Sequence, residues 1–144
     1  MQDATQRHTQ RIQTHQFGVI DIEPHQIFTF SDGLIGFTHL TEFVLINDDS
    51  TAPIQWLMSL QDATIGLPVI NALLIDPQYK PALEADAQTQ TVYVVVNLSG
   101  GNIRINMKAP IIVSSATMQG EQIVLSSERY QTDYTLQTQH SSVR

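Results

Sequence analysis

The main pattern in the chain is an alternation of apolar and polar residues with a period of two, which runs from residue 17 to residue 125. Its clearest stretch is Ile103-Arg104-Ile105-Asn106-Met107-Lys108, where odd positions are apolar and even positions are polar. This pattern predicts a half-buried β-strand, whose side chains alternate between two faces. We expect its three apolar residues to face the core and its three polar residues to face away. Further strands are predicted at residues 17–22, 27–30, 42–46, 54–60, 66–70, 92–98, 111–113 and 122–125.

Local features of these strands indicate how they connect. The run Val92–Val96 barely alternates, which indicates a strand that is covered on both faces. Gly100-Gly101 follows it and predicts a hairpin turn into the next strand. Pro110 cannot donate a hydrogen bond to a neighbouring strand, so a kink or a barrel corner is expected there. Only residues 81–88 have a helix-favouring composition, with a proline in the first turn.

The spacing of these strands predicts an all-β domain. Many short strands joined by short turns are typical of a barrel or a sandwich. We expect one such domain at residues 17–130. Residues 1–16 and 131–144 are polar and aperiodic, and they offer too little apolar surface to offset the entropy of ordering them. Both ends are therefore expected to be mobile polar tails.

The composition restricts the classes of function. The 144 residues include 14 acidic and 7 basic side chains, which gives a formal net charge of −7. Nucleic-acid binding needs concentrated Lys and Arg, so direct contact with nucleic acid is not expected. The absence of Cys excludes disulfides and thiolate chemistry. No apolar run is long enough to span a bilayer, and no signal-peptide pattern is present, so we expect a cytoplasmic protein without membrane contact.

No pattern in the chain predicts catalysis. The five histidines, three of them in the polar ends, form no pair at the spacing of metal ligands. The nucleophile motif Gly-x-Ser-x-Gly does not occur. Asp48 and Asp49 are adjacent on a predicted turn and should point in different directions, which favours a solvated loop over an acid pair. We therefore expect no catalytic residue, no metal and no cofactor.

Two aromatic residues are candidates for binding. Trp56, the only tryptophan, lies in a predicted strand and is either a core residue or a partly exposed anchor for a partner. Tyr79 lies between Pro77 and Pro81 on a predicted loop. Such a residue either packs its own loop or contacts a partner, and the sequence leaves both interpretations open.

A series of short motifs follows along the predicted domain. They are Phe17-Gly18, Ile27-Phe28-Thr29-Phe30, Gly33-Leu34-Ile35-Gly36-Phe37, Phe43-Val44-Leu45, Trp56-Leu57-Met58-Ser59-Leu60-Gln61-Asp62, Tyr79 within residues 77–83, Asn106-Met107-Lys108-Ala109-Pro110-Ile111-Ile112-Val113 and Gly120-Glu121-Gln122-Ile123-Val124-Leu125. In this order the motifs resemble the bacterial flagellar assembly factor FliW family. The resemblance covers nearly all of residues 17–130.

The resemblance implies a small antiparallel β-barrel of short strands with at most one short helix, and no enzymatic activity. It also implies that the protein binds flagellin and antagonises CsrA, a small basic RNA-binding regulator that represses flagellin translation. An acidic chain suits a basic partner. By resemblance, and because amide, carboxylate and aromatic groups on loops suit a polar interface, we expect a partner-binding surface on the loop-bearing side. Its predicted residues are Asp48, Asp49, Ser59, Gln61, Asp62, Tyr79, Lys80 and Pro81.

Two residues depart from the family pattern. Met58 replaces the usual Gln of the tryptophan motif, and Lys80 follows Tyr79 where the family commonly has an acidic residue. The second change favours flagellin over CsrA as the expected partner. The alternative function is a small-molecule-binding β-barrel. It is disfavoured because the alternating strands place aliphatic residues inside without a convergent set of inward polar groups.

Overall fold

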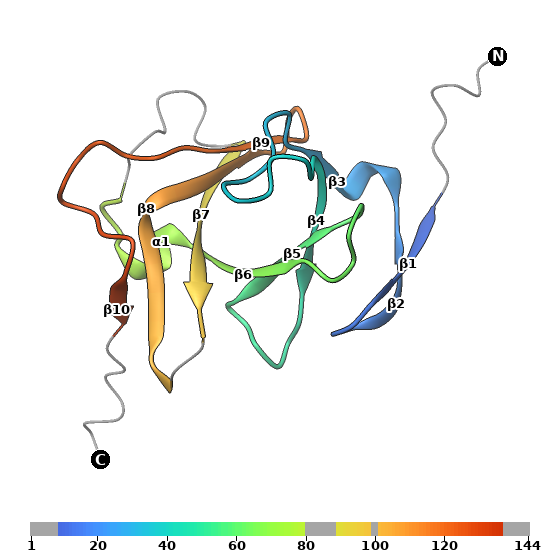
Figure 1. Cartoon of the computed structure of the whole chain (residues 1–144), viewed down its shortest axis with the longest axis horizontal. Helices are drawn as coiled ribbons and strands as arrows, with labels where there is room; N and C mark the ends of the chain where they lie inside the picture. Colours follow the sequence, from blue (N-terminus) through green and yellow to red (C-terminus); the bar gives the residue numbers. More distant parts are fainter. Residues whose placement is uncertain (1–8, 80–88, 99–100, 137–144) are drawn as a thin grey trace.

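The computed structural model describes residues 9–79, 89–98 and 101–136, and most of these residues lie in β-strands (Figure 1). The strands are β1 (Gln10–Thr14), β2 (Gly18–Ile22), β3 (Ile27–Thr29), β4 (Glu42–Asn47), β5 (Gln55–Ser59), β6 (Gly66–Asn71), β7 (Gln90–Asn97), β8 (Ile103–Ser114), β9 (Gln119–Gln122) and β10 (Tyr134–Leu136). The helical elements of the described part are a 3-10 turn, η2 (Pro24–Gln26), and a short α-helix, α1 (Ala72–Ile75). The helix expected at residues 81–88 lies outside the described residues.

Seven strands close into a barrel. The sheet order is β10-β8-β7-β6-β5-β4-β3-β9, and β9 also pairs with β8, which completes the ring. Neighbouring strands are antiparallel, except that β3 and β9 meet in parallel through the single pair Thr29 and Gln119. β10 lies outside the ring and pairs with the first residues of β8. The prediction of a small all-β barrel is confirmed.

The interior of the barrel is filled by side chains. Phe30 and Phe43 are fully buried and meet edge to face, with ring centroids 5.3 Å apart. Leu57 and Val69, from the next two strands, pack in the same cluster. A Cβ atom added to Gly120 would overlap the Phe30 ring, so the chain passes directly over this ring. Such dense filling argues against a ligand cavity inside the barrel.

The outer face of β3, β4 and β5 is covered by a two-stranded ribbon formed by β1 and β2 (Figure 1). Trp56 lies under this ribbon with only 9% of its surface exposed, and its Nε1 donates to Thr51 Oγ1 at 3.1 Å. The ring of Phe17 meets it edge-on at 6.1 Å. Trp56 is therefore a core residue and not a partly exposed anchor for a partner. Met58 is also buried here and packs directly against Gly66 on β6.

The outer face of β6, β7 and β8 is covered by α1, the Tyr79 loop and the C-terminal segment. Figure 1 shows α1 and this orange-to-red segment on the same side of the barrel, beside β8. Val92, Val94 and Val96 of β7 pack in this outer cluster, whereas Tyr93 faces the interior. The run without alternation is thus covered on both faces, as its composition predicts.

The pairing of β7 with β8 is irregular next to Pro110. Tyr93 lies opposite Ile111, but Val95 lies opposite Asn106, so the pairing moves by three positions within two residues of β7. The resulting bulge contains Pro110, whose carbonyl accepts the N–H of a residue beyond β9. β8 therefore runs through the proline as one strand, and the expected kink takes the form of a bulge.

The bulge decides which residues of β8 face outward. An odd shift in pairing exchanges the two faces of a strand. Ile105 and Met107 are buried in the outer cluster, whereas Ile111 beyond the bulge is buried in the barrel interior. Asn106 Oδ1 accepts the N–H groups of Lys108 and Ala109 at 3.0 and 3.1 Å and so holds the bulge. The alternation predicted at residues 103–108 is present, with Ile103 only half-buried.

The structure differs from the expected tails at two places. The predicted N-terminal tail ends at residue 16, but β1 forms within it, and the predicted C-terminal tail begins at residue 131, but β10 forms within it. In β1, the single aliphatic Ile12 packs against the cluster around Trp56, while pairing with β2 satisfies the main chain. In β10, Leu136 packs against the outer cluster. One apolar side chain is enough to order each of these strands, because it packs against an apolar cluster that other strands already form.

Candidate functional site

Asp48 and Asp49 lie in the loop that joins β4 to β5. Asp48 Oδ1 accepts the Ser50 N–H at 3.1 Å and the Ser50 Oγ hydroxyl at 3.0 Å, so its carboxylate shapes the turn. Asp49 is exposed. The loop therefore presents negative charge to solvent, with Asp49 as its accessible carboxylate.

Ser59, Gln61 and Asp62 form the turn that joins β5 to β6. Ser59 is fully buried, and its Oγ accepts the N–H groups of Gln61 and Asp62. Gln61 Oε1 accepts the Thr41 N–H at 2.6 Å, which ties the turn to the start of β4. Thr64 donates two hydrogen bonds to Asp62 and lowers the pKa of that carboxyl. These side chains mainly hold the turn, so only part of the predicted surface is available to a partner.

The two loops lie at opposite ends of the same hairpin. In the register of β4 and β5, Asn47 is opposite Gln55 and Phe43 is opposite Ser59. The Asp48 loop extends beyond the first pair and the Asp62 turn beyond the second. The six residues of β4 separate them by about 17 Å. The structure therefore does not bring the two predicted groups into one patch.

Tyr79 is completely buried, contrary to the expectation that it offers an anchor to a partner. Its hydroxyl donates to the Met107 carbonyl at 2.7 Å, and its ring meets the Tyr130 ring edge to face at 4.8 Å. Burial raises the pKa of the Tyr79 hydroxyl well above its usual value. The tyrosine packs its own loop against β8. Lys80 and Pro81, predicted beside it, lie outside the described residues.

A surface groove lies next to Tyr79, between α1 and the C-terminal segment, with a volume of about 570 Å³. We call it the α1 groove. It is lined by Ile75, Asp76, Met107, Arg129, Tyr130, Gln131 and Tyr134. Two structural features hold its walls. Asn71 Oδ1 accepts the Leu73 N–H and starts α1, and the Met107 N–H donates to the Gln131 carbonyl, which fixes the C-terminal segment to β8.

The α1 groove combines apolar, aromatic and charged groups. The Arg129 guanidinium lies 5.6 Å from the centre of the Tyr130 ring. Leu73 and Leu74, which precede Ile75 in α1, are 42% and 61% exposed, and Tyr134 is 41% exposed. Exposed leucine and tyrosine beside a concave surface with an arginine are typical of protein-binding sites.

The sequence analysis did not select these residues as a site. Tyr130 and Tyr134 were the available signal, because two tyrosines four positions apart are unusual in an otherwise polar segment. Leu73-Leu74 was a second signal, since two adjacent leucines cannot both face the core at the end of a strand. Neither signal shows that α1 and the C-terminal segment meet, which depends on the pairing of β8 with β10.

A second, polar hollow of about 360 Å³ lies near β9. Asp32 and Glu121 both line it. Of the two hollows, the α1 groove has the tyrosines and the arginine that are typical of a protein-binding site.

Within the described ranges, no group of three or more His, Asp or Glu side chains is placed to hold a metal ion. Across the same part of the chain, no helix has the length and apolar character needed to cross a membrane.

The strands and both covering layers fall within one family match. The family described as FliW protein matches residues 10–136. The chain belongs to the FliW family. Its match begins with β1 and ends with β10, so the two strands outside the expected domain are part of the family's domain.

Individual FliW proteins show the same relationship. The flagellar assembly factor FliW of Thermotoga maritima is 37% identical over 128 residues, covering 81% of this chain and 86% of that protein. FliW of Lachnospira eligens is 31% identical over 139 residues, covering 86% and 92%. A crystal structure of a flagellar assembly factor FliW has a TM-score of 0.81 and 24% identity, and the match covers 88% of this chain and 96% of that one. This likeness shows the shared barrel fold.

Proposed function

We propose that this protein acts in flagellum assembly as a non-enzymatic cytoplasmic binding protein with two alternative partners, flagellin and CsrA. Flagellin export would then free it to bind CsrA and relieve the repression of flagellin translation. The observation that carries this proposal is the family match over residues 10–136, together with relatives that are named flagellar assembly factors. The filled barrel supports a role in protein binding, since packed apolar side chains occupy its interior.

The α1 groove is the surface that we assign to flagellin. Its lining includes the exposed Tyr134 and the partly buried Tyr130, and Leu74 is exposed next to the lining residue Ile75. An interface of this kind gains affinity when apolar groups leave water around a few anchors. Tyr79 takes part indirectly, because its ring and hydroxyl support Tyr130 and Met107 from below.

We assign CsrA to the loop of Asp48 and Asp49, in which Asp49 is exposed. The turn of Gln61 and Asp62, at the other end of the hairpin, would be a second and separate contact. The net charge of −7 favours association with a basic protein over long distances. Lys80 and Pro81, which directly follow Tyr79 in the sequence, are kept as proposed partner-binding residues.

Binding of the purified proteins tests this function. Isothermal titration calorimetry should show binding to flagellin and, in a separate titration, to CsrA. A third titration of CsrA into the preformed flagellin complex should show strongly reduced binding. A chain that binds neither protein would refute the proposal. Binding of both at once would refute the alternation between partners while leaving each interaction intact.

A further inference from the structure

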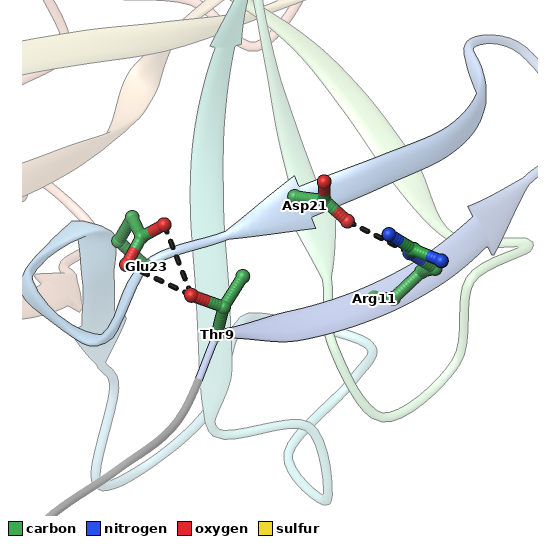
Figure 2. Close-up of polar contacts among 4 residues, drawn as sticks. All are labelled: Thr9, Arg11, Asp21 and Glu23. Carbon is green, nitrogen blue, oxygen red and sulfur yellow. Dashed lines mark hydrogen bonds and ion pairs between the residues drawn. The ribbon is translucent and has the colours of Figure 1, made fainter.

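Arg129, which lines the α1 groove, has no carboxylate partner in the described part of the chain. The other two arginines of that part are paired. Figure 2 shows Arg11 and Asp21 reaching toward each other across β1 and β2, with Nε to Oδ1 at 2.9 Å. Arg104 Nε lies 3.3 Å from Asp133 Oδ1. In a chain with 14 acidic and 7 basic side chains, an arginine without an acid beside it is a distinctive feature.

Aromatic packing and the main chain position this guanidinium. Its Cζ lies 5.6 Å from the centre of the Tyr130 ring, and that ring packs edge to face on the buried Tyr79. The Arg129 main-chain N–H donates to Ser127 Oγ, and the Ser127 carbonyl accepts from Lys108 on β8. A contact with an aromatic ring uses the charge of the cation and needs no acceptor for its N–H groups. The guanidinium donors have no acceptor among the described residues, so they are available to a group that enters the groove.

A carboxylate beside an apolar group fits this part of the groove. The N–H donors of a guanidinium match the two oxygens of a carboxylate, and the opposite charges strengthen these hydrogen bonds. Ile75, Met107 and Tyr134 line the same groove and supply apolar surface next to the charge. A chain segment with an acidic side chain and a neighbouring apolar side chain combines both features.

The groove also contains a carboxylate of its own. Asp76 lies at the end of α1, on the wall across from Arg129. Its Oδ1 accepts the Gln78 N–H at 3.0 Å, and no ion pair joins it to Arg129 in the described structure. The two walls therefore carry opposite charges. An entering carboxylate is attracted to the C-terminal wall and repelled from the α1 wall, which sets its place in the groove.

We propose that Arg129 is a carboxylate-binding residue that takes an acidic side chain of flagellin into the α1 groove. This inference rests on the proposed assignment of flagellin to that groove. The net charge of −7 opposes an acidic segment at long range, but salt screens charges beyond about 8 Å under physiological conditions. The guanidinium at the contact therefore outweighs the distant carboxylates. A segment with a basic side chain at this place would meet a like charge and be rejected.

Two charge removals inside the groove test the sign of the bound group. Arg129→Gln should weaken flagellin binding about tenfold or more, since it removes a charge-assisted contact. Asp76→Asn keeps an oxygen for the Gln78 N–H and removes a repulsion, so it should strengthen binding roughly twofold. Isothermal titration calorimetry of the full chain with flagellin measures both shifts. A basic side chain in the groove would reverse both signs and overturn the inference.

Arg11→Gln is the matched control for Arg129→Gln. It removes the same charge by the same substitution, but Arg11 lies in the ribbon of β1 and β2, on the side of the barrel away from β10 (Figure 1). It should leave flagellin affinity unchanged. Arg129 is exposed, so Arg129→Gln should keep the melting temperature nearly unchanged. Equal losses of affinity in both variants would assign the effect to net charge and overturn the inference.

A double-mutant cycle identifies the bound carboxylate. Each Asp of flagellin is changed to Asn and each Glu to Gln, one at a time, and every variant is titrated with the unchanged protein and with Arg129→Gln. One flagellin variant should lose about tenfold in affinity for the unchanged protein and little for Arg129→Gln. If none shows this coupling, or if Arg129→Gln binds flagellin normally, the inference is overturned and the proposed function stands. If the unchanged protein does not bind flagellin, the proposed function fails and the inference fails with it.

Discussion

The hydroxyl of Tyr79 donates a hydrogen bond to the main-chain carbonyl of Met107, 28 residues further along the chain, at 2.7 Å. The N–H of Met107 donates in turn to the Gln131 carbonyl at 2.8 Å. One residue of β8 therefore joins the loop after α1 to the C-terminal segment. Both walls of the α1 groove depend on this junction, which makes Tyr79 a supporting residue for a surface that it does not itself form.

Replacing Tyr79 should destabilise the fold. Tyr79→Ala removes a fully buried ring and should lower the free energy of unfolding by about 3–5 kcal/mol. Tyr79→Phe keeps the ring and loses the hydrogen bond to Met107, so it should cost about 1–3 kcal/mol. Urea denaturation followed by fluorescence measures both variants. An unchanged midpoint for Tyr79→Ala would show that the ring is not packed as described.

The same residue should make the protein sensitive to alkali. Burial raises the pKa of the Tyr79 hydroxyl above its usual value of about 10. Above pH 10 the unfolded chain loses this proton while the folded chain keeps it, so the free energy of unfolding should fall as pH rises. Between about pH 8 and pH 12, the melting temperature of Tyr79→Phe should fall less steeply with pH than that of the unchanged protein. A residual slope is expected from Tyr93, whose pKa is also raised by burial.

The sequence predicts much of the barrel because its strands have a regular period. Ile105 is buried as the alternation of its strand predicts, and Val94 is buried as the lack of alternation in its strand predicts. The sequence does not show on which side of the sheet each is buried. That depends on the three-position shift in the pairing between β7 and β8, which exchanges the faces of β8 before and after Pro110.

The candidate site was predicted less well for a related reason. Tyr79 lies on a loop between two prolines. The residues next to it in the sequence do not indicate that it packs against Tyr130 and donates a hydrogen bond to β8. Ile12 and Leu136 are single apolar residues in polar segments, so local composition indicates tails. They are ordered by surfaces that distant strands provide, and a window of local sequence contains no information about those surfaces.

Two changes in β8 should differ sharply in their effect on stability. Ile105 is 1% exposed in the outer cluster, so Ile105→Ala should lower the free energy of unfolding by about 2–4 kcal/mol. Lys108 contributes one exposed hydrogen bond to the Ser127 carbonyl, and Lys108→Ala should change it by no more than about 0.5 kcal/mol. Thermal melts of both variants under one condition provide the comparison. Equal losses would contradict the described register of β8.

Reversing the charge of Asp49 should slow association with CsrA. Asp49 is exposed in the β4–β5 loop, where a basic partner would sense it at a distance. Asp49→Lys should lower the association rate constant at low salt, and the effect should fade as salt screens the charges. Glu128→Lys is the matched control, because Glu128 is also exposed but lies in the segment after β9, away from both ends of the β4–β5 hairpin. Equal effects of both variants would indicate a response to net charge alone.

Leu74, next to the groove-lining Ile75, tests binding at the edge of the α1 groove. Its side chain is 61% exposed beside Ile75, so Leu74→Asp should leave the melting temperature nearly unchanged. In a complex with flagellin, the new carboxylate would lose its water without gaining a partner, and binding should weaken by more than about 1 kcal/mol. Calorimetry and thermal melting on the same preparation measure the two effects separately.

Val124→Asp is the matched control for this test. Val124 is 64% exposed and lies just after β9, whereas Leu74 lies in α1 next to the groove-lining Ile75; the change adds the same negative charge to the protein. It should leave flagellin affinity unchanged, since a surface charge away from the interface acts only weakly through screened solvent. Loss of affinity in both variants would assign the effect to net charge. Loss only in Val124→Asp would move the flagellin surface from the α1 groove to the segment after β9.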